Sequence, residues 1–432
     1  MVTSRQQTVS STRRDAWVEV DLGAIEHNLH VIQSWLQPGP TDGEIAARHL
    51  NSTSPSPTSV KRKPRLMAVV KSDAYGHGAA GIAEVLIASG ADWFAVASVD
   101  EGCQLRNIDG KIPILLLSPV PSWAIPTALE FGLDLTVTSA AQVNEIAVVA
   151  ARKKAQARLH LKVDTGMHRL GIAPQYVDVV LNEIKKNDHL HLISVFSHLA
   201  RADHLESTTY QNDQFHQIVQ LVRQAEPELR SRERHATTDP ILFHLASGDA
   251  TRRFPQTQYD MVRTGLVLYG LEPRRTSDVV IPAMSVRGRI NHVSEIAAGQ
   301  SVGYNWTWTA KRPTRLASIP IGYADGVDRH LSNKLLGLLM GEQIPQVGTI
   351  SMDQMLFDIT DVAEAQEGDV ITLIGTDGER NIQLSSWAEL LDTITYELAC
   401  RMRVRLPRVY TRHPHAPVSP PSSQNSSGNH KV

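Results

Sequence analysis

The sequence predicts a parallel (β/α)8 barrel followed by a mostly β domain. Eight near-continuous apolar runs alternate with helix-like stretches between residues 66 and 270, as expected for parallel strands buried on both faces. After Gly270 the chain changes to short β-rich segments broken by Gly and Pro. A doubly wound open sheet is the alternative for the first region. The count of eight, and the charged or hydroxyl residues at the ends of the runs, favour the barrel.

The segments before the barrel are short. Residues 1–15 are polar and are predicted to be disordered, and AWVEV at 16–20 is predicted to form a strand. Asp21 is placed to cap a helix, because apolar residues follow at spacings of three and four: Leu22, Ile25, Leu29 and Ile32. Pro38 and Gly39 are expected to end that helix.

The stretch from residue 39 to 65 is rich in Ser, Pro and Thr and has no lasting periodicity. We interpret it as a loop insertion in the barrel domain. Its last five residues, KRKPR at 61–65, form a basic run. A nucleic-acid contact is one explanation, but a solvated loop rim fits the overall charge balance better.

The eight runs are the predicted barrel strands, and they lie at 66–71, 93–98, 112–118, 133–138, 157–164, 192–198, 241–247 and 261–270. The barrel domain is therefore assigned to residues 16–275 and the β domain to residues 276–412. Whether the strand at 16–20 joins the β domain is left open. Residues 413–432 are rich in Pro, Ser and Asn and are predicted to form a disordered tail.

Composition favours a small-molecule enzyme. The 432 residues include 43 Lys and Arg against 45 Asp and Glu, a formal net charge of -2. This balance gives no field that attracts nucleic acid or an anionic membrane. We see no signal peptide and no apolar run long enough to span a bilayer, so we expect a cytoplasmic protein. Cys103 and Cys400 fit no metal-ligand spacing, so we expect reduced, structural thiols and no metal site.

Ionisable residues mark the ends of the predicted strands. Lys71 ends the first run, where barrel enzymes place catalytic groups, and a partly desolvated lysine can form an imine with a carbonyl. A surface lysine would be the commoner explanation for Lys71 alone. Further charged or titratable residues occur at Lys162, Arg169, His198 and Arg263. An interior lysine such as Lys162 is costly unless it is neutralised or paired. Taken together, the set favours a functional site.

Two more features belong to the predicted site. The backbone amides of Gly265 and Leu266, just after Arg263, could bind a phosphate. In the β domain, SVGYNWTWTA and IGYADGVDR offer Tyr304 and Tyr323. Taken singly, such tyrosines are more often packing residues with a hydrogen-bonded hydroxyl.

These strings together resemble the alanine racemase family, pyridoxal-phosphate enzymes of fold type III. AVVKSDAYGHG is close to the family's lysine signature, and KVDTGMHRLG, VRTGLVLYG, IGYADGVDR, GTISMDQ and TYELACRMRVRLPRVY follow in family order. The resemblance covers roughly residues 15 to 411. It implies a homodimer with shared active sites that interconverts L-alanine and D-alanine and supplies D-alanine for peptidoglycan.

The resemblance also assigns roles to residues. Lys71 resembles the Schiff-base lysine and the base on one face of the substrate, and Tyr304, from a partner subunit, resembles the base on the other. Arg263 resembles the arginine at the pyridine nitrogen, and Arg169 the one at the cofactor's phenolic oxygen and the substrate. The phosphate is expected at Tyr75, Tyr396, Gly265 and Leu266.

Other positions follow from the same resemblance. His198 matches a histidine bonded to Arg263, Met352 a substrate-pocket residue, and Lys162 a lysine that is often carbamylated. The substrate-access corridor is expected at Tyr323, Asp325 and Arg329. One string departs from the family: HLASGDA replaces the usual HxANSA, so Ser247 is the candidate for the phosphate-binding hydroxyl.

The chemistry explains why two bases are needed. The cofactor delocalises the negative charge left when the α-proton departs, and inversion needs a proton donor on the opposite face. A decarboxylase of the same fold is disfavoured, because LEPRR lacks the glycine of that group's EPGR string. A single-barrel pyridoxal-phosphate carrier would lack the β domain. A broad-specificity or serine racemase stays open, although Tyr396 favours alanine by resemblance.

Overall fold

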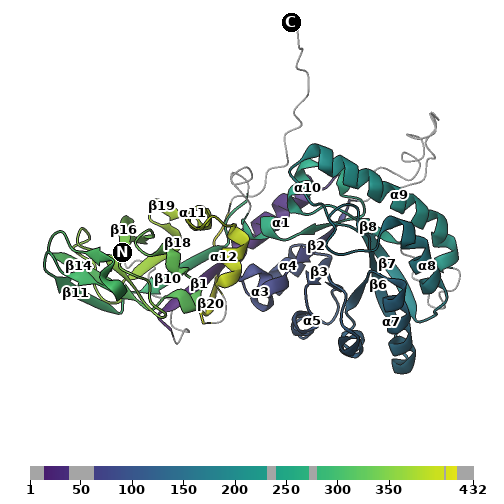
Figure 1. Ribbon diagram of the computed structural model, residues 1–432, viewed down its shortest axis with the longest axis horizontal. Coiled ribbons are helices and arrows are strands. Elements are labelled where there is room, and N and C mark those ends of the chain that lie inside the picture. The colour runs from purple at the N-terminus through teal and green to yellow at the C-terminus, as the bar shows by residue number, and fades with distance from the viewer. Residues whose placement is uncertain (1–13, 38–62, 231–239, 272–279, 403–404, 416–432) are drawn as a thin grey trace, which may run out of the picture.

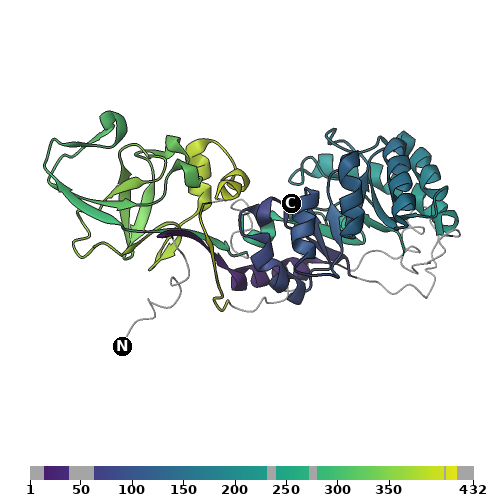
Figure 2. The same cartoon turned by 90° about the horizontal axis from the view of Figure 1, so that it is seen from below.

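The computed structural model describes residues 14–37, 63–230, 240–271, 280–402 and 405–415. Figures 1 and 2 show two bodies side by side along the long axis, a barrel surrounded by helices and a domain built mainly of strands. The first segment of the chain, drawn in purple, runs from the β domain into the barrel.

The barrel strands confirm the eight predicted runs. They are β2 (Arg65–Val69), β3 (Trp93–Val96), β4 (Ile114–Leu116), β5 (Asp134–Val137), β6 (Ala157–Lys162), β7 (Leu190–Phe196), β8 (Leu242–His244) and β9 (Met261–Thr264). All neighbouring pairs are parallel, in chain order from β2 to β8, and β2 also pairs with β9. Two backbone hydrogen bonds join β8 to β9: Asp260 N donates to Phe243 O, and Arg263 N donates to Ala246 O. These closing bonds rule out the open-sheet alternative.

Helices surround the barrel. They are α1 (Leu22–Trp35), α4 (Ala79–Ala88), α5 (Val99–Arg106), α6 (Ile125–Glu130), α7 (Ala140–Lys153), α8 (Val177–Lys185), α9 (Leu205–Arg230) and α10 (Gly248–Arg253). Helix α1 comes first in the chain but packs between α4 and α10, so it completes the ring. Its predicted cap is confirmed, since the Asp21 carboxylate accepts a hydrogen bond from Gly23 N at 2.8 Å.

The β domain contains a long sheet ordered β11-β14-β17-β16-β15-β18-β10-β1-β20, with β19 paired to β18, and a separate β12–β13 pair. Its strands are β1 (Ala16–Asp21), β10 (Met284–Arg289), β11 (His292–Ile296), β12 (Ser301–Val302), β13 (Trp308–Thr309), β14 (Thr314–Ile319), β15 (Leu336–Leu339), β16 (Glu342–Val347), β17 (Met355–Asp358), β18 (Val370–Asp377), β19 (Arg380–Ile382) and β20 (Arg408–Thr411). Strand β1 pairs with β10 and β20. Assigning all of residues 16–275 to the barrel domain was therefore wrong for β1, whose hydrogen-bonding edges both belong to the second sheet.

The two domains meet at the glycine-rich turn after Lys71. Helices α11 (Leu384–Leu391) and α12 (Thr395–Arg401) close the β domain, and α12 packs on α3 (Lys71–Tyr75). A Cβ on Gly76, whose φ is +84°, would lie 2.2 Å from Ala399 O. A Cβ on Gly78 would lie 2.0 Å from the Tyr410 hydroxyl. Because these two glycines have no side chain, the backbone of the turn can approach the β domain closely.

Three predicted loops fall largely outside the described residues: most of 1–15, most of 39–65 and most of 413–432. Their described ends make defined contacts. Arg14 forms an ion pair with Asp325 at 2.6 Å, and His415 forms one with Asp21 at 2.7 Å. Arg65 begins β2. The prediction of disorder is therefore wrong for Arg14 and His415, because the largely buried carboxylates of Asp325 and Asp21 hold them.

Candidate active site

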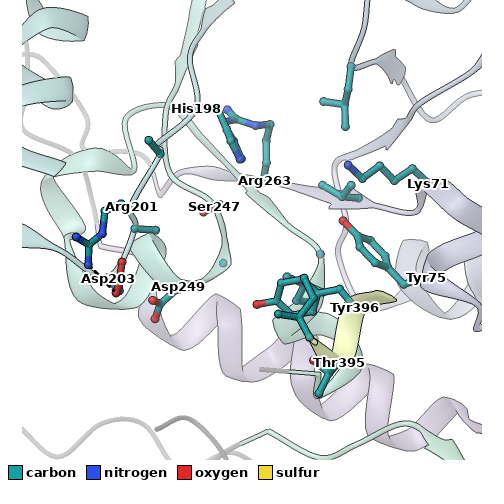
Figure 3. Close-up of a pocket in the computed structure, with 18 of the residues that line it drawn as sticks. Lys71, Tyr75, His198, Arg201, Asp203, Ser247, Asp249, Arg263, Thr395 and Tyr396 are labelled. Carbon is teal, nitrogen blue, oxygen red and sulfur yellow. Dashed lines mark hydrogen bonds and ion pairs between the residues drawn. The ribbon is translucent and has the colours of Figure 1, made fainter. Parts of the chain in front are cut away.

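A cavity of about 1450 Å³ opens at the C-terminal mouth of the barrel. Residues from α11 and α12 form its far wall, so both domains build it. Ten residues predicted from the sequence line it: Lys71, Tyr75, Lys162, Arg169, His198, Ser247, Arg263, Gly265, Leu266 and Tyr396. Figure 3 shows Lys71, Tyr75 and Tyr396 on one side of this space and His198, Ser247 and Arg263 on the other.

Lys71 is held by an unusual turn. The φ angles of the next four residues, Ser72 to Tyr75, are all between 53° and 55°, which is the left-handed region. Such a conformation costs L-residues roughly 1 kcal/mol or more each. Glu101 stabilises it by accepting hydrogen bonds from Ser72 N at 2.6 Å and Ala97 N at 2.8 Å. Burial, followed by the positive charge of Arg169, lowers the pKa of the Lys71 amino group.

Both terminal nitrogens of Arg263, Nη1 and Nη2, donate hydrogen bonds to several acceptors. Nη1 donates to Nδ1 and O of His244 at 2.8 and 2.9 Å. Nη2 donates to Ser197 O at 2.6 Å, to Leu245 O at 3.0 Å and to His198 Nδ1 at 3.4 Å. Within the described part of the chain, Nε has no such partner, which leaves it available to a ligand in the cavity. Burial lowers the pKa of Arg263 to about 9, so it remains a cation at neutral pH.

The two histidines beside Arg263 are neutral. Burial, and next the charge of Arg263, lowers the pKa of both His198 and His244 well below the ordinary value. Each can therefore accept from the guanidinium through Nδ1. The predicted contact between His198 and Arg263 is present, although at 3.4 Å it is longer than the His244 contact.

Lys162 lies inside the barrel, as predicted. Its Nζ sits 4.4 Å from the centre of the Phe196 ring, and that ring stacks on His244 with centroids 4.8 Å apart. Burial, and next the charges of Arg263 and Arg169, lowers the pKa of Lys162 to about 7. Neutralisation of Lys162 near physiological pH is thus physically reasonable.

Hydroxyl groups and free turn amides gather at one end of the cavity. Tyr75 packs against the buried Tyr269 with tilted rings whose centroids are 5.4 Å apart, and a Cβ on Gly265 would lie 3.0 Å from the Tyr75 hydroxyl. The 3₁₀ turn η4 (Leu266–Tyr269) starts there, and the first amides of such a turn have no acceptor within it. Ser247 lies at the N-terminus of α10 and supplies a further hydroxyl. This donor set suits a phosphate.

The barrel interior divides into an apolar and a polar half. The apolar half consists of Met67, Val69, Trp93, Ala95, Leu115, Leu242 and Met261. The polar half includes residues that the sequence reasoning did not select: Asp134, Arg158, His160, Ser194 and His244. A signal was present, because Arg158, His160 and Lys162 alternate with apolar residues at the two-residue period of a strand.

Tyr304 and Met352 do not line the cavity. They lie on an exposed face of the β domain that we call the Tyr304 face: Tyr304, Trp306, Tyr323 and Met352, exposed by 69%, 75%, 43% and 52%. Hydrogen bonds to backbone carbonyls hold its segments in place, since the Thr349 hydroxyl donates to Tyr304 O and Ala324 N donates to Met352 O. One chain therefore carries two separate groups of predicted site residues.

Two predicted corridor residues differ in their setting. Arg329 is exposed. Asp325 is buried with no exposed side-chain surface, where it binds Arg14 and accepts from Gly322 N at 3.0 Å. Asp325 thus fixes the 3₁₀ turn η6 (Tyr323–Asp325) that carries Tyr323.

Known proteins share both halves of this architecture. Residues 57–273 match the family described as "Alanine racemase, N-terminal domain", and residues 283–410 match "Alanine racemase, C-terminal domain". The chain belongs to the alanine racemase family. The match to the second domain separates it from single-barrel carriers. Alanine racemases of Nostoc sp. and Synechocystis sp. are each 36% identical to it, over 91% and 92% of this chain and 95% and 99% of theirs.

Solved alanine racemase structures have the same fold. That of Clostridium difficile gives a TM-score of 0.79 at 28% identity and covers 93% of this chain and 97% of that one. That of Bacillus anthracis with bound L-Ala-P gives 0.79 at 30% identity, covering 94% and 97%. A histidine racemase of Leuconostoc mesenteroides, 24% identical with a TM-score of 0.76, shares the fold. Family membership makes the chain an isomerase.

Two further findings concern the described residues. Among them, no helix is both long enough and apolar enough to cross a membrane. Within the same described part of the chain, neither Cys103 nor Cys400 forms a disulfide.

Proposed function

We propose that this chain is a pyridoxal-phosphate-dependent enzyme that interconverts L-alanine and D-alanine as a homodimer. The observation that carries the proposal is the convergence of ten predicted residues on one cavity with Lys71 at its mouth. These residues come from five barrel strands or the loops after them and from α12. So wide a separation in sequence makes a chance gathering of these groups improbable.

The residues around the cavity fit pyridoxal phosphate. Lys71 would hold it covalently through Nζ, because its lowered pKa favours the neutral nucleophilic amine. The phosphate would be held by the hydroxyl groups of Tyr75, Ser247 and Tyr396 and by the amides of Gly265 and Leu266. When bound, this cofactor supplies an electron sink for the charge left by the departing α-proton.

Arg263 would set the strength of that sink. Its Nε is the guanidinium nitrogen left over by the protein, and it would donate to the pyridine nitrogen. Because arginine keeps its proton, the pyridine nitrogen would remain unprotonated and the sink weak. A weak sink limits transamination. Arg169 would hold the phenolic oxygen and lie beside the substrate.

Two bases would exchange the proton. Lys71 would act on one face of the α-carbon, and Tyr304 from the partner subunit on the other. The exposure of Tyr304 and Met352 outside the cavity of their own chain supports this arrangement. A two-fold dimer would place the Tyr304 face of each subunit over the cavity of the other. Tyr323 and Arg329 would then border the access corridor, and Asp325 would support it from beneath.

The product suggests the cellular role. We propose that the enzyme works in the cytoplasm and supplies D-alanine for peptidoglycan. The substrate test is direct: purified protein is incubated with L-alanine, L-serine and other L-amino acids, and each D-enantiomer is measured by chiral chromatography. We expect D-alanine to form fastest. Faster formation of D-serine, or equal rates for many amino acids, would instead support the broad-specificity alternative, and the shared fold of a histidine racemase makes that control necessary.

A further inference from the structure

A continuous chain of hydrogen bonds runs through the polar half of the barrel and ends at Arg263. Arg263 Nη1 lies 2.8 Å from His244 Nδ1, and His244 Nε2 lies 2.7 Å from Ser194 Oγ. Ser194 Oγ lies 2.6 Å from His160 Nδ1, and His160 Nε2 lies 3.0 Å from Asp134 Oδ2. The chain thus links five strands, from the first residue of β5 to β9 at the mouth.

The two ends fix the direction of every proton in this chain. Arginine can only donate, so His244 Nδ1 must accept and His244 Nε2 must carry the hydrogen. Asp134, as a carboxylate, can only accept, so His160 Nε2 carries a hydrogen, and in a neutral imidazole this leaves His160 Nδ1 to accept from Ser194. Ser194, the central residue, then accepts from His244 and donates to His160. All four bonds point the same way, and both rings take the Nε2–H tautomer.

Burial of the three central residues enforces this direction of the hydrogen bonds. His160, Ser194 and His244 have no exposed surface, so water cannot replace a missing partner. Burial alone would raise the pKa of Asp134, but the His160 hydrogen bond and the Arg158 ion pair hold it below the usual value. Arg158 Nε lies 2.7 Å from Asp134 Oδ1. Trp93 Nε1 also donates to this carboxylate, at 3.3 Å. These contacts therefore stabilise the carboxylate form of Asp134 at this end of the chain.

We infer that Asp134, His160 and Ser194 are positioning residues that hold His244 in the tautomer that accepts from Arg263. None of the three lines the cavity. They act through His244, because Ser194 supplies the acceptor for His244 Nε2–H, and without that acceptor the Nε2–H form would leave a buried donor unpaired. Holding Arg263 in this way fixes the orientation of Nε, the nitrogen left for the ligand. This role in positioning Arg263 for the cofactor rests on the proposed function, whereas the tautomer assignment does not.

A matched pair of variants at Ser194 tests the chain. Threonine and valine have nearly the same shape, but only threonine keeps the hydroxyl, so Ser194→Thr is the control for Ser194→Val. A second pair acts at the distant end: Asp134→Asn keeps an acceptor for His160, and Asp134→Leu removes it. Where the added methyl group at 194 prevents folding, Ser194→Ala gives the same loss without extra volume.

The first readout is the tautomer itself. Two-dimensional ¹⁵N–¹H spectra of protein with labelled histidine distinguish Nε2–H from Nδ1–H rings, with assignments from His160→Gln and His244→Gln. We expect both rings in the Nε2–H form in the wild type, Ser194→Thr and Asp134→Asn. We expect Ser194→Val and Asp134→Leu to change the His244 signals, although Asp134 lies three hydrogen bonds away from His244. A wild-type His244 in the Nδ1–H form would overturn the inference.

The second readout is reaction specificity, measured as transamination events per racemisation event. A displaced Arg263 should raise this ratio by roughly fivefold in Ser194→Val and Asp134→Leu, the effect of one lost hydrogen bond, and leave it unchanged in the two controls. A ratio that is equal in Ser194→Val and Ser194→Thr would overturn the positioning role. The spectra do not depend on turnover, so a failure of the proposed racemisation would leave the tautomer result separate.

Discussion

The barrel mouth and the Tyr304 face contrast in almost every physical respect. The mouth is a cavity in which Lys71, Lys162 and Arg263 are all largely buried and have lowered pKa values. The Tyr304 face is open, with Tyr304 exposed by 69% and Met352 by 52%. The mouth is organised by contacts within one chain, whereas Tyr304 and Met352 lie outside the cavity of their own chain.

This difference indicates that the two predicted bases, Lys71 and Tyr304, obtain their reactive environments in different ways. The amino group of Lys71 is tuned by its own chain, through burial and the charge of Arg169. Tyr304 can become buried only when another molecule covers it. A second subunit that places its cavity mouth there would supply both the covering and the positive charges that a tyrosine base needs. The predictions below separate the contributions of the two regions.

The largest effect is expected at the mouth. Lys71→Ala should abolish measurable racemisation, a loss of more than about four orders of magnitude, because it removes both the covalent attachment and one base. Borohydride treatment of the wild type, followed by peptide mass spectrometry, should fix the cofactor on the peptide that contains Lys71. An equal yield of reduced cofactor–protein adduct in Lys71→Ala would show that another lysine carries it.

Tyr304→Phe tests the other region. We expect a loss of roughly 10²- to 10⁴-fold in both directions, because inversion in either sense uses both bases. Cofactor binding should remain nearly intact, since Tyr304 is not among the residues assigned to hold the phosphate or the ring. One enantiomer of alanine should still exchange its α-proton with deuterated solvent through Lys71, and the other should not. Tyr176→Phe is the matched control, because Tyr176 is exposed by 56% on the barrel surface outside the cavity.

Mixing the two inactive variants tests whether the regions combine across subunits. Lys71→Ala and Tyr304→Phe chains that exchange should form mixed dimers with one complete site. Recovery to about a quarter of wild-type activity is expected, because about half of the dimers are mixed and each has one working site of two. If chain exchange is demonstrated and no activity returns, Tyr304 serves its own subunit or is not a base.

The contrast between the barrel mouth and the Tyr304 face also explains which features the sequence could predict. The eight strands were visible as apolar runs, and seven of the ten cavity residues were visible because strand ends meet at the barrel mouth. Tyr75, Ser247 and Tyr396 were found only through the resemblance to the family. The roles of most of the ten came from the same resemblance. The hydrogen-bonded interior, including Ser194 and His244, was missed. Its members sit within apolar runs, and only the three-dimensional register brings Ser194 between His160 and His244. The membership of β1 in the second sheet depends on pairing across more than 260 residues.

A smaller effect on rate, but a clear one on products, is expected for Arg263→Glu. An acid at this position would let the pyridine nitrogen become protonated and strengthen the electron sink. Racemisation should fall, and the ratio of transamination to racemisation should rise at least tenfold. Both reactions can be followed with one sample by chiral analysis of alanine and by pyruvate formation. An unchanged ratio would show that Arg263 does not control reaction specificity.

The smallest expected effect on turnover, and a distinct effect on stability, concerns Lys162. Its pKa falls from the usual 10.5 to about 7 in the folded protein. Between these values the unfolded chain holds a proton that the folded chain does not, so the stability of the wild type should rise with pH across this window. Lys162→Met lacks this dependence. It should be more stable than the wild type below pH 7, by at most about 5 kcal/mol, and lose that advantage as the pH approaches 10.5.

Carbamylation of Lys162 would change this pH dependence of stability in a specific way. A neutral amine reacts with CO₂, and the resulting carbamate would place a negative charge near Arg169 and Arg263, the cations that lower the pKa of Lys162. The pH series is therefore measured by denaturant unfolding in CO₂-free buffer and again with ¹³C-bicarbonate, with carbon NMR to detect the carbamate. Bicarbonate should stabilise the wild type near pH 7 and leave Lys162→Met unaffected. Lys111→Met, at an exposed position, is the control and should show neither effect. A wild type without a carbamate signal, and with the same pH dependence as Lys162→Met, would mean that Lys162 remains an ordinary charged lysine in the folded protein.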